Sequence, residues 1–135
     1  MQNQLKSSVV AVCVTLCVLT AQIPTFAHHG ANIYDLSKTV VLKGTVTEFK
    51  FSNPHVQVYF DVKDESGNVV NWNAEGNGVY FWSKVGWNKN SLKSGDQITV
   101  TLHPSKSGSP VGVVIKMVAA GGKEIVTELA GESVK

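Results

Sequence analysis

The chain has 135 residues, of which 43% are hydrophobic and 16% are charged, a composition that excludes a disordered chain and suits one small globular domain. The formal net charge is +2, and the twelve basic residues are all lysines placed singly along the chain. Proteins that read nucleic acids use clustered positive charge and arginine forks, so we expect no nucleic-acid partner.

The first 27 residues have the pattern of a secretory signal peptide. Lys6 precedes an apolar run from Val9 to Ala21, and Thr25 and Ala27 are small residues of the kind that signal peptidase accepts. The run is shorter than the roughly 20 residues that a membrane-spanning helix needs. We expect cleavage after Ala27, a periplasmic or secreted protein, and no stable membrane anchor after cleavage. An uncleaved amino-terminal anchor is the alternative.

Both cysteines, Cys13 and Cys17, lie inside this leader. The processed chain therefore offers no disulfide, thiolate metal site or cysteine nucleophile, and its core must hold together by packing alone. We divide the chain into a signal peptide over 1–27, an amino-terminal arm over 28–38, a barrel domain over 39–126 and a flexible tail over 127–135.

Short alternating segments separated by turn residues fill the barrel domain. We expect strands over 39–51, 55–63, 69–75, 97–103, 111–118 and 123–126. In the first strand the apolar positions change parity after Val46, which predicts a bulge, and Gly44 eases sharp coiling. In the third strand we expect Val70, Trp72 and Ala74 to face inward.

A change of period over 79–85 predicts a helix of about two turns. Asn77 is the expected N-cap, and Gly86 is placed as the glycine that follows the helix. Trp87 then folds back on Trp82. Three strands, a short helix and two further strands predict a mainly β, small OB-type barrel of five to six strands, with the helix between strands three and four. An open β-sandwich, or a roll with the helix on one end, is the alternative.

Several motifs, in matching order over nearly all of the processed chain, resemble an uncharacterised family of small exported bacterial proteins known as a domain of unknown function. They are Ala27-His28-His29, Phe51-Ser52-Asn53-Pro54-His55, Asn71-Trp72, Gly86-Trp87 and Ser91-Leu92-Lys93-Ser94-Gly95-Asp96. Gly30 stands where the family has a serine, and Phe51 stands where a tryptophan is more usual. The resemblance implies an exported, compact domain and supplies no activity.

The sharpest chemical feature is the pair of histidines that cleavage would place at the new amino terminus. The free amine and the imidazole of His28 can chelate one metal ion, and His29 can act instead as a second-residue imidazole. Nitrogen-rich donor sets suit Cu(II), so copper is the expected cofactor if there is one. The alternative is that both histidines are solvated residues of a flexible arm.

His55 is the third candidate metal ligand, because it follows an Asn-Pro turn at the start of a strand. The alternative for His55 is structural, with the Asn53 side chain bonding the backbone and His55 bonding a loop carbonyl. His103, which precedes Pro104, is interpreted as a solvated strand end.

A second candidate site is the outward face of the second and third strands, where OB-type barrels commonly bind extended ligands. Amide-rich side chains with one aromatic ring suit a sugar or a peptide. An ordinary solvated sheet face is the alternative. The expected ligand or partner residues are His55, Gln57, Tyr59, Asn71, Asn73 and Glu75.

Enzyme signatures are missing from the sequence. It has neither a Gly-x-Ser-x-Gly elbow nor a phosphate-binding glycine loop after a strand. Asp61 and Glu75 share a sheet face, but nothing in the pattern marks them as a catalytic pair. We expect a non-catalytic exported accessory protein whose unknown ligand or protein partner lies on the strand face. The alternative is a periplasmic copper-binding protein that uses the amino-terminal histidines.

Overall fold

Six strands and one short helix make up the structure, a computed structural model that describes residues 33–127. The elements lie within a few residues of the predicted bounds. In chain order they are β1 (Val40–Lys50), β2 (Gln57–Lys63), β3 (Val69–Glu75), α2 (Val79–Lys84), β4 (Gln97–Pro104), β5 (Val111–Ala119) and β6 (Glu124–Val126).

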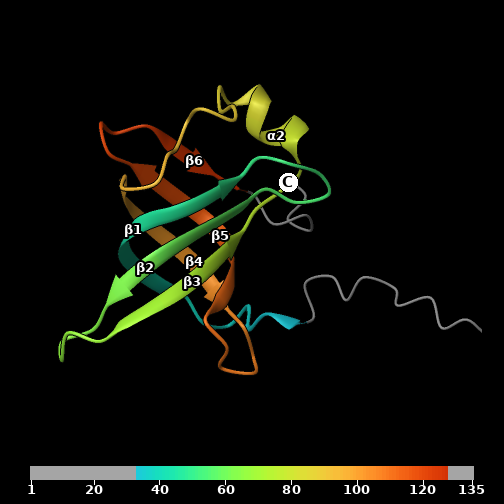
Figure 1. The fold of residues 1–135 in the computed structure, drawn as a ribbon. Coiled ribbons are helices and arrows are strands. Elements are labelled where there is room, and N and C mark those ends of the chain that lie inside the picture. Colours follow the sequence, from blue (N-terminus) through green and yellow to red (C-terminus); the bar gives the residue numbers. More distant parts are fainter. Residues whose placement is uncertain (1–32, 128–135) are drawn as a thin grey trace, which may run out of the picture.

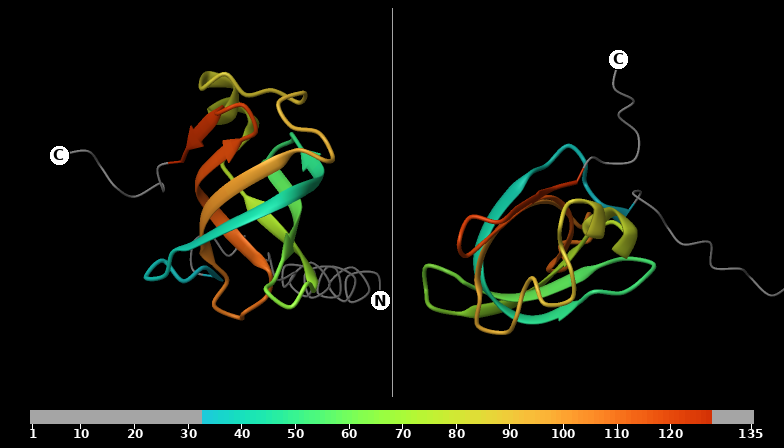
Figure 2. Two further views of the ribbon diagram at one scale, coloured as in Figure 1. Left: turned by 90° about the vertical axis from the view of Figure 1, so that its left-hand side faces the viewer. Right: turned by 90° about the horizontal axis from the view of Figure 1, so that it is seen from above.

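The strands close into a barrel (Figures 1 and 2). They pair in the order β3-β2-β1-β4-β5-β6, and all of these pairings are antiparallel. A short parallel pairing of β3 with β5 over Asn73–Glu75 completes the ring. With α2 between β3 and β4, this arrangement confirms the OB-type barrel.

The strong coiling of β1 lets one strand serve two neighbours. Its first half, Val40–Thr45, pairs with β4, and its second half, from Thr45 onward, pairs with β2. The register shifts between Val46 and Glu48, which confirms the predicted bulge. Gly44 lies at the changeover, where the chain passes too close to β2 to accommodate a side chain.

The barrel interior is apolar and closely packed, and α2 covers one end of it (Figure 2, right). Trp82 from α2 and Trp87 after it are both buried, with their ring centroids 5.2 Å apart and their planes at 87°. The other main interior side chains are Val46, Val56, Val58, Phe60, Ala74, Ile98, Val100, Leu102, Val114 and Met117. Burying each of the larger ones contributes roughly 1.5–3 kcal/mol.

The end of α2 has the predicted form, whereas its start does not. Trp87 N–H donates to Trp82 O at 2.9 Å and Gly86 N–H donates to Ser83 O at 3.0 Å, which is the expected glycine-ended turn. Asn77 is not the N-cap, since Gly78 occupies that position without a side-chain bond. Asn53, in the β1–β2 loop, supplies the missing acceptor. Its side-chain Oδ1 accepts a hydrogen bond from the N–H of Val79 at 3.1 Å.

Val70 also departs from the expected inward face, because its side chain is 41% exposed. Ala74, further along β3, is buried as predicted, and Trp72 is half-buried. The turn of the β2–β3 hairpin projects beyond the barrel wall (Figure 1). The inner face of β3 therefore packs against the core only near the carboxyl end of the strand, and Val70, near the turn, lies outside it.

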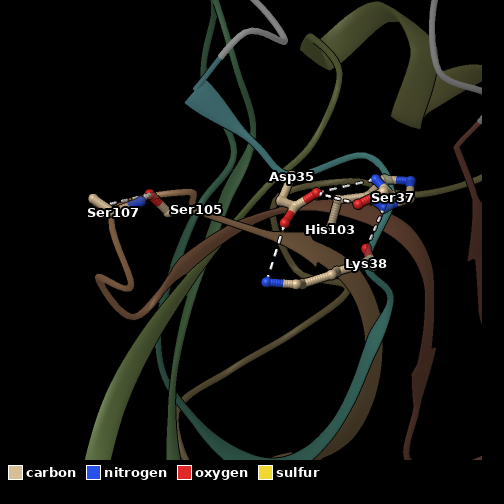
Figure 3. Close-up of polar contacts among 6 residues, drawn as sticks. All are labelled: Asp35, Ser37, Lys38, His103, Ser105 and Ser107. Carbon is tan, nitrogen blue, oxygen red and sulfur yellow. Dashed lines mark hydrogen bonds and ion pairs between the residues drawn. The ribbon is translucent and has the colours of Figure 1, made fainter.

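His103 is not a solvated strand end, because residues 34–38 pack across the end of β4 (Figure 3). The side chain is buried, and its Nδ1 donates to Lys38 O at 2.6 Å. Tyr34 forms an isolated antiparallel β-bridge with Ser105, and Asp35 N–H donates to Pro104 O at 2.8 Å. The arm therefore extends the folded domain at this edge.

Candidate functional site

The β2–β3 face is defined here by the outward-facing side chains His55, Gln57, Tyr59, Asn71, Asn73 and Glu75. The antiparallel register places Gln57 opposite Glu75 and Tyr59 opposite Asn73. His55 lies just before β2, beside Glu75 at the end of β3. The structure thus brings the six predicted residues together on β2, β3 and the residues just before β2, and these two strands lie at the front of the barrel in Figure 1.

Tyr59 lies at the centre of this face and is held from two sides. Its hydroxyl donates to Gln57 Oε1 at 3.1 Å, and the Lys50 ammonium group lies 4.7 Å from the ring centroid. Lys50 comes from β1, where it pairs with Gln57. The cation–π contact and the hydrogen bond together restrict the orientation of the ring.

The turn-proximal half of the face is a polar network. Asn71 Nδ2 donates to Asp61 Oδ1 at 2.7 Å and to Thr47 Oγ1 at 3.1 Å. Asn73 Oδ1 is buried without a hydrogen-bond partner among residues 33–127. Asp61 and Glu75 do not pair, because the register places Asp61 opposite Asn71 and Glu75 opposite Gln57.

At the other end of the face, His55 contacts two acceptors through one ring nitrogen. Its Nδ1 lies 3.1 Å from Gly76 O and 3.4 Å from Glu75 Oε1. Because both neighbours are acceptors, a neutral ring must carry its proton on Nδ1. Nε2 then keeps its lone pair, and the His55 side chain is half exposed. The predicted bond from His55 to a loop carbonyl is thus present.

Tyr34 joins this cluster from the arm. Its hydroxyl donates to the second carboxylate oxygen of Glu75, Oε2, at 3.2 Å, while its ring is buried. Burial is the main cause that raises the pKa of Tyr34 well above its ordinary value, and the negative charge and hydrogen bond of Glu75 raise the pKa further. Glu75 therefore has one oxygen toward Tyr34 and the other toward His55.

We expect Tyr34 to make the protein less stable as the pH rises above about 10. The unfolded chain, in which tyrosine has its ordinary pKa of about 10, loses this proton first, so ionisation favours the unfolded state. The free energy of unfolding then falls by up to about 1.4 kcal/mol per pH unit, the limit for a group that stays protonated in the folded state. Urea unfolding at pH 9, 10 and 11 measures it.

Tyr34→Phe is the control, because it keeps the buried ring and removes the proton. Its free energy of unfolding should fall less steeply with pH than that of the wild type. Equal slopes in the two proteins would contradict the assignment. Absorbance of the phenolate provides a second readout, since the wild type should show a late-titrating tyrosine that Tyr34→Phe lacks.

Sequence reasoning missed two members of the site, Tyr34 and Lys50. Tyr34 lies in a segment without periodicity, and only the folded contact with Glu75 reveals it. The position of Lys50 beside the face depends on the register of β1 against β2, and a bulge between Val46 and Glu48 shifts this register. A sequence argument can place a bulge in a strand, but it does not fix the resulting pairing.

The predicted metal ligands are not assembled by the described part of the chain. His28 and His29 lie outside residues 33–127, and the structure says nothing of them. Within 33–127, no group of three His, Cys, Asp or Glu side chains could hold a metal ion. His55 is thus the one predicted ligand whose geometry is visible. Over the same residues, no helix is long and apolar enough to cross a membrane.

Comparisons with known proteins concern the fold and the family. No curated protein matches the sequence. Among solved structures, the mitochondrial single-stranded DNA binding protein Rim1 of S. cerevisiae is similar to this chain at 10% sequence identity and a TM-score of 0.46. The match covers 62% of this chain and 93% of that chain.

This comparison contradicts the prediction that nucleic acid is excluded as a partner, because the similar solved protein is one that binds single-stranded DNA. Barrels of this type bind single strands by stacking bases on aromatic side chains along a positively charged groove, and arginine forks are not required for this. The lack of arginine therefore does not by itself exclude a single-stranded partner. At this identity and TM-score, the likeness assigns none to this chain either.

The family is shown by the sequence itself. A family model matches residues 15–115, three quarters of the chain, including the Asn-Pro-His turn, the Gly-Trp pair and the Ser-Leu-Lys segment that carried the resemblance. The model describes a family of unknown function, so membership adds no activity. The chain belongs to the family of unknown function DUF6152.

Proposed function

We propose that the chain is exported, is cleaved after Ala27, and works outside the cytoplasm as a non-catalytic binding module that holds a polar ligand or partner on the β2–β3 face. The signal-peptide pattern supports export. The OB-type barrel supports the choice of face, because this fold commonly binds ligands across strands two and three.

The observation that carries the proposal is the fixed ring of Tyr59. An aromatic side chain whose orientation is already restricted loses little conformational entropy on binding. Amide groups flank it on both strands, with Gln57 on one side and Asn73 opposite. Such a set offers stacking together with hydrogen-bond donors and acceptors, which suits a sugar or a peptide.

The carboxylates of the face support binding over catalysis. Asp61 accepts a hydrogen bond from Asn71, and Glu75 accepts one from Tyr34. Since each carboxylate already has its own partner and the two lie opposite different residues, they form no acid–base pair of the kind that hydrolysis needs.

We expect the double variant Tyr59→Ala with Asn73→Ala to lose binding while the barrel stays folded. The first change removes the stacking surface and the second removes the opposing amide, and both side chains are on the outer face. Chemical-shift mapping with a panel of neutral oligosaccharides and short peptides measures the binding, and far-UV circular dichroism measures the fold.

The matched control is Lys43→Ala with Thr99→Ala, which changes a facing pair on the outer side of β1 and β4. This control should bind as the wild type does. The proposal fails if the control loses binding and the Tyr59–Asn73 variant keeps it, or if wild-type shifts map away from β2 and β3.

A second candidate, a copper-binding protein that uses the amino-terminal histidines, is favoured by the orientation of His55 in the folded domain. A Cu(II) titration of the processed chain tests it, with intact mass fixing the first residue. Selective acetylation of the α-amine near neutral pH is the comparison, because this amine has a pKa of about 8 against about 10.4 for lysine. If acetylation leaves Cu(II) affinity unchanged, the terminal chelate is excluded.

A further inference from the structure

The edge of β3 that lies away from β2 is paired only in part. Residues 73–75 pair with β5 on this side, but no strand among residues 33–127 pairs there with residues 69–72. Figure 1 shows the β2–β3 hairpin carrying this half of β3 past the barrel wall. An unpaired sheet edge offers its backbone N–H and C=O groups to another strand, so this edge is a candidate interaction surface.

The backbone groups that face this open edge belong to Val69 and Asn71. Along an antiparallel strand, the N–H and C=O groups of successive residues point alternately to one side and to the other. Asn73 N–H donates to Pro110 O at 3.0 Å, on the side away from β2. The backbone groups of Asn71 and Val69 therefore have this orientation too, while those of Val70 face β2. The open edge thus presents two donors and two acceptors.

This edge lacks the features by which proteins keep a free edge from pairing. Edge strands are commonly protected by charged side chains, by proline or by a bulge. Residues 68–74 include no charged residue and no proline, and β3 pairs with β2 without a register shift. Val69 and Val70 expose 57% and 41% of their surface. An uncharged edge with two exposed valines fits a partner strand that is also uncharged and apolar.

We propose that the partner is a second copy of this chain, whose own open β3 edge pairs antiparallel with the first about a two-fold axis at Val70. In this register Val69 exchanges both backbone hydrogen bonds with Asn71 of the second copy, and Asn71 does the same with Val69 of that copy. Val70 then lies directly opposite Val70 of the second copy in a close pair, so each exposed valine covers the other. The inference goes beyond the proposed function and does not depend on it.

Charge also favours a second copy as the occupant of the edge. The register brings the β2–β3 turn of one copy opposite Asn73 of the other, where Pro110 ends the β4–β5 loop. The turn contains Asp64 and Glu65, whereas Lys106 is the one charged residue of the β4–β5 loop. Opposite charges thus meet on both sides of the axis. Because the paired edge is short and stable interfaces bury about 1,200–2,000 Å², we expect a weak dimer that dissociates on dilution.

The experiment measures the sedimenting mass of the processed chain over a range of concentrations. The wild type should pass from the mass of one chain to that of two as its concentration rises. Val70→Glu and Val70→Lys should each stay monomeric, because like charges would lie directly opposite each other at the axis. An equimolar mixture of the two variants should restore the dimer, since the facing charges are then opposite.

Val85→Glu is the matched control, because it makes the same change at another exposed valine. Val85 directly follows α2, and Figure 1 shows α2 and the β2–β3 turn at opposite ends of the barrel. This variant should dimerise as the wild type does. Far-UV circular dichroism should show the same strand content in the wild type and in every variant.

Amide hydrogen exchange gives a second readout that depends on the direction of each N–H group. At concentrations where the wild type is dimeric, the N–H groups of Val69 and Asn71 should be protected. In Val70→Glu they should exchange at least tenfold faster. The N–H group of Trp72, which faces β2, should exchange at the same rate in both proteins.

A wild type that stays monomeric at millimolar concentration would overturn the inference, and so would a dimer that Val85→Glu disrupts and Val70→Glu leaves intact. If the mixed variants fail to pair, the axis is not at Val70 and the inference fails as well. If the two edge amides become protected only when a short peptide is added, the edge takes a foreign strand and a second copy is not its partner. Loss of the dimer in Val70→Glu with unchanged ligand binding supports the inference and leaves the proposed function standing.

Discussion

Replacing Trp82 with alanine is expected to destabilise the barrel by about 3–5 kcal/mol, the usual cost of truncating a large buried aromatic side chain. Trp82 is fully buried where α2 covers the barrel. Its ring meets Trp87 edge-on at 5.2 Å and lies 6.2 Å from the ring of Phe49. Alanine would leave a cavity beneath the helix that these neighbours cannot fill. Urea unfolding followed by far-UV circular dichroism measures the change.

Phenylalanine substitutions at the two tryptophans give a sharper comparison. Trp82 Nε1 is buried without a hydrogen-bond partner among the residues that the structure describes, whereas Trp87 Nε1 donates to Glu124 O at 3.3 Å. Trp82→Phe removes an unsatisfied donor, while Trp87→Phe leaves a carbonyl without its donor. We therefore expect Trp87→Phe to cost more free energy of unfolding than Trp82→Phe. The reverse order would contradict this account of the core.

The same region shows why much of the fold follows from local sequence. Gly86 adopts a φ of +84°, a conformation that glycine reaches without strain, and the Trp82–Trp87 contact closes the turn within six residues. The strands likewise follow from alternation, because a half-buried strand must place apolar residues at every second position. Both signals lie within a short stretch of chain, so they can be read without knowing the fold.

Features that depend on distant segments could not be read in this way. His103 alternates outward as predicted from β4, yet it is buried because residues 34–38 cover it. The acceptor for the first turn of α2 comes from Asn53, 26 residues earlier, and not from the adjacent Asn77. In the candidate site, the placement of the six β2–β3 face residues on one side of the sheet was predictable from the two-residue alternation and from the order of the strands. The contacts of Tyr34 and Lys50 were not.

Gly44→Ala is expected to destabilise the barrel by about 3 kcal/mol, at the upper end of the cost of overpacking a core. A Cβ at this position would lie 2.5 Å from the backbone oxygen of Asp61 and 2.8 Å from the ring of Phe60. Phe60 is fully buried and the Asp61 carbonyl belongs to β2, so neither can move aside. The clash falls where β1 changes partner from β4 to β2, and relieving it would separate strands on which barrel closure depends.

Gly67→Ala is the matched control for this prediction, since the chemical change is identical. Gly67 lies in the β2–β3 turn with nothing within 4 Å of its added Cβ, but with a φ of +85°. Its cost is therefore backbone strain alone, about 1–2 kcal/mol, without any clash. Urea unfolding should rank Gly44→Ala as the more destabilised of the two. Equal losses would mean that close approach of β1 to β2 does not limit the residue at 44, and that the coiling of β1 has another cause.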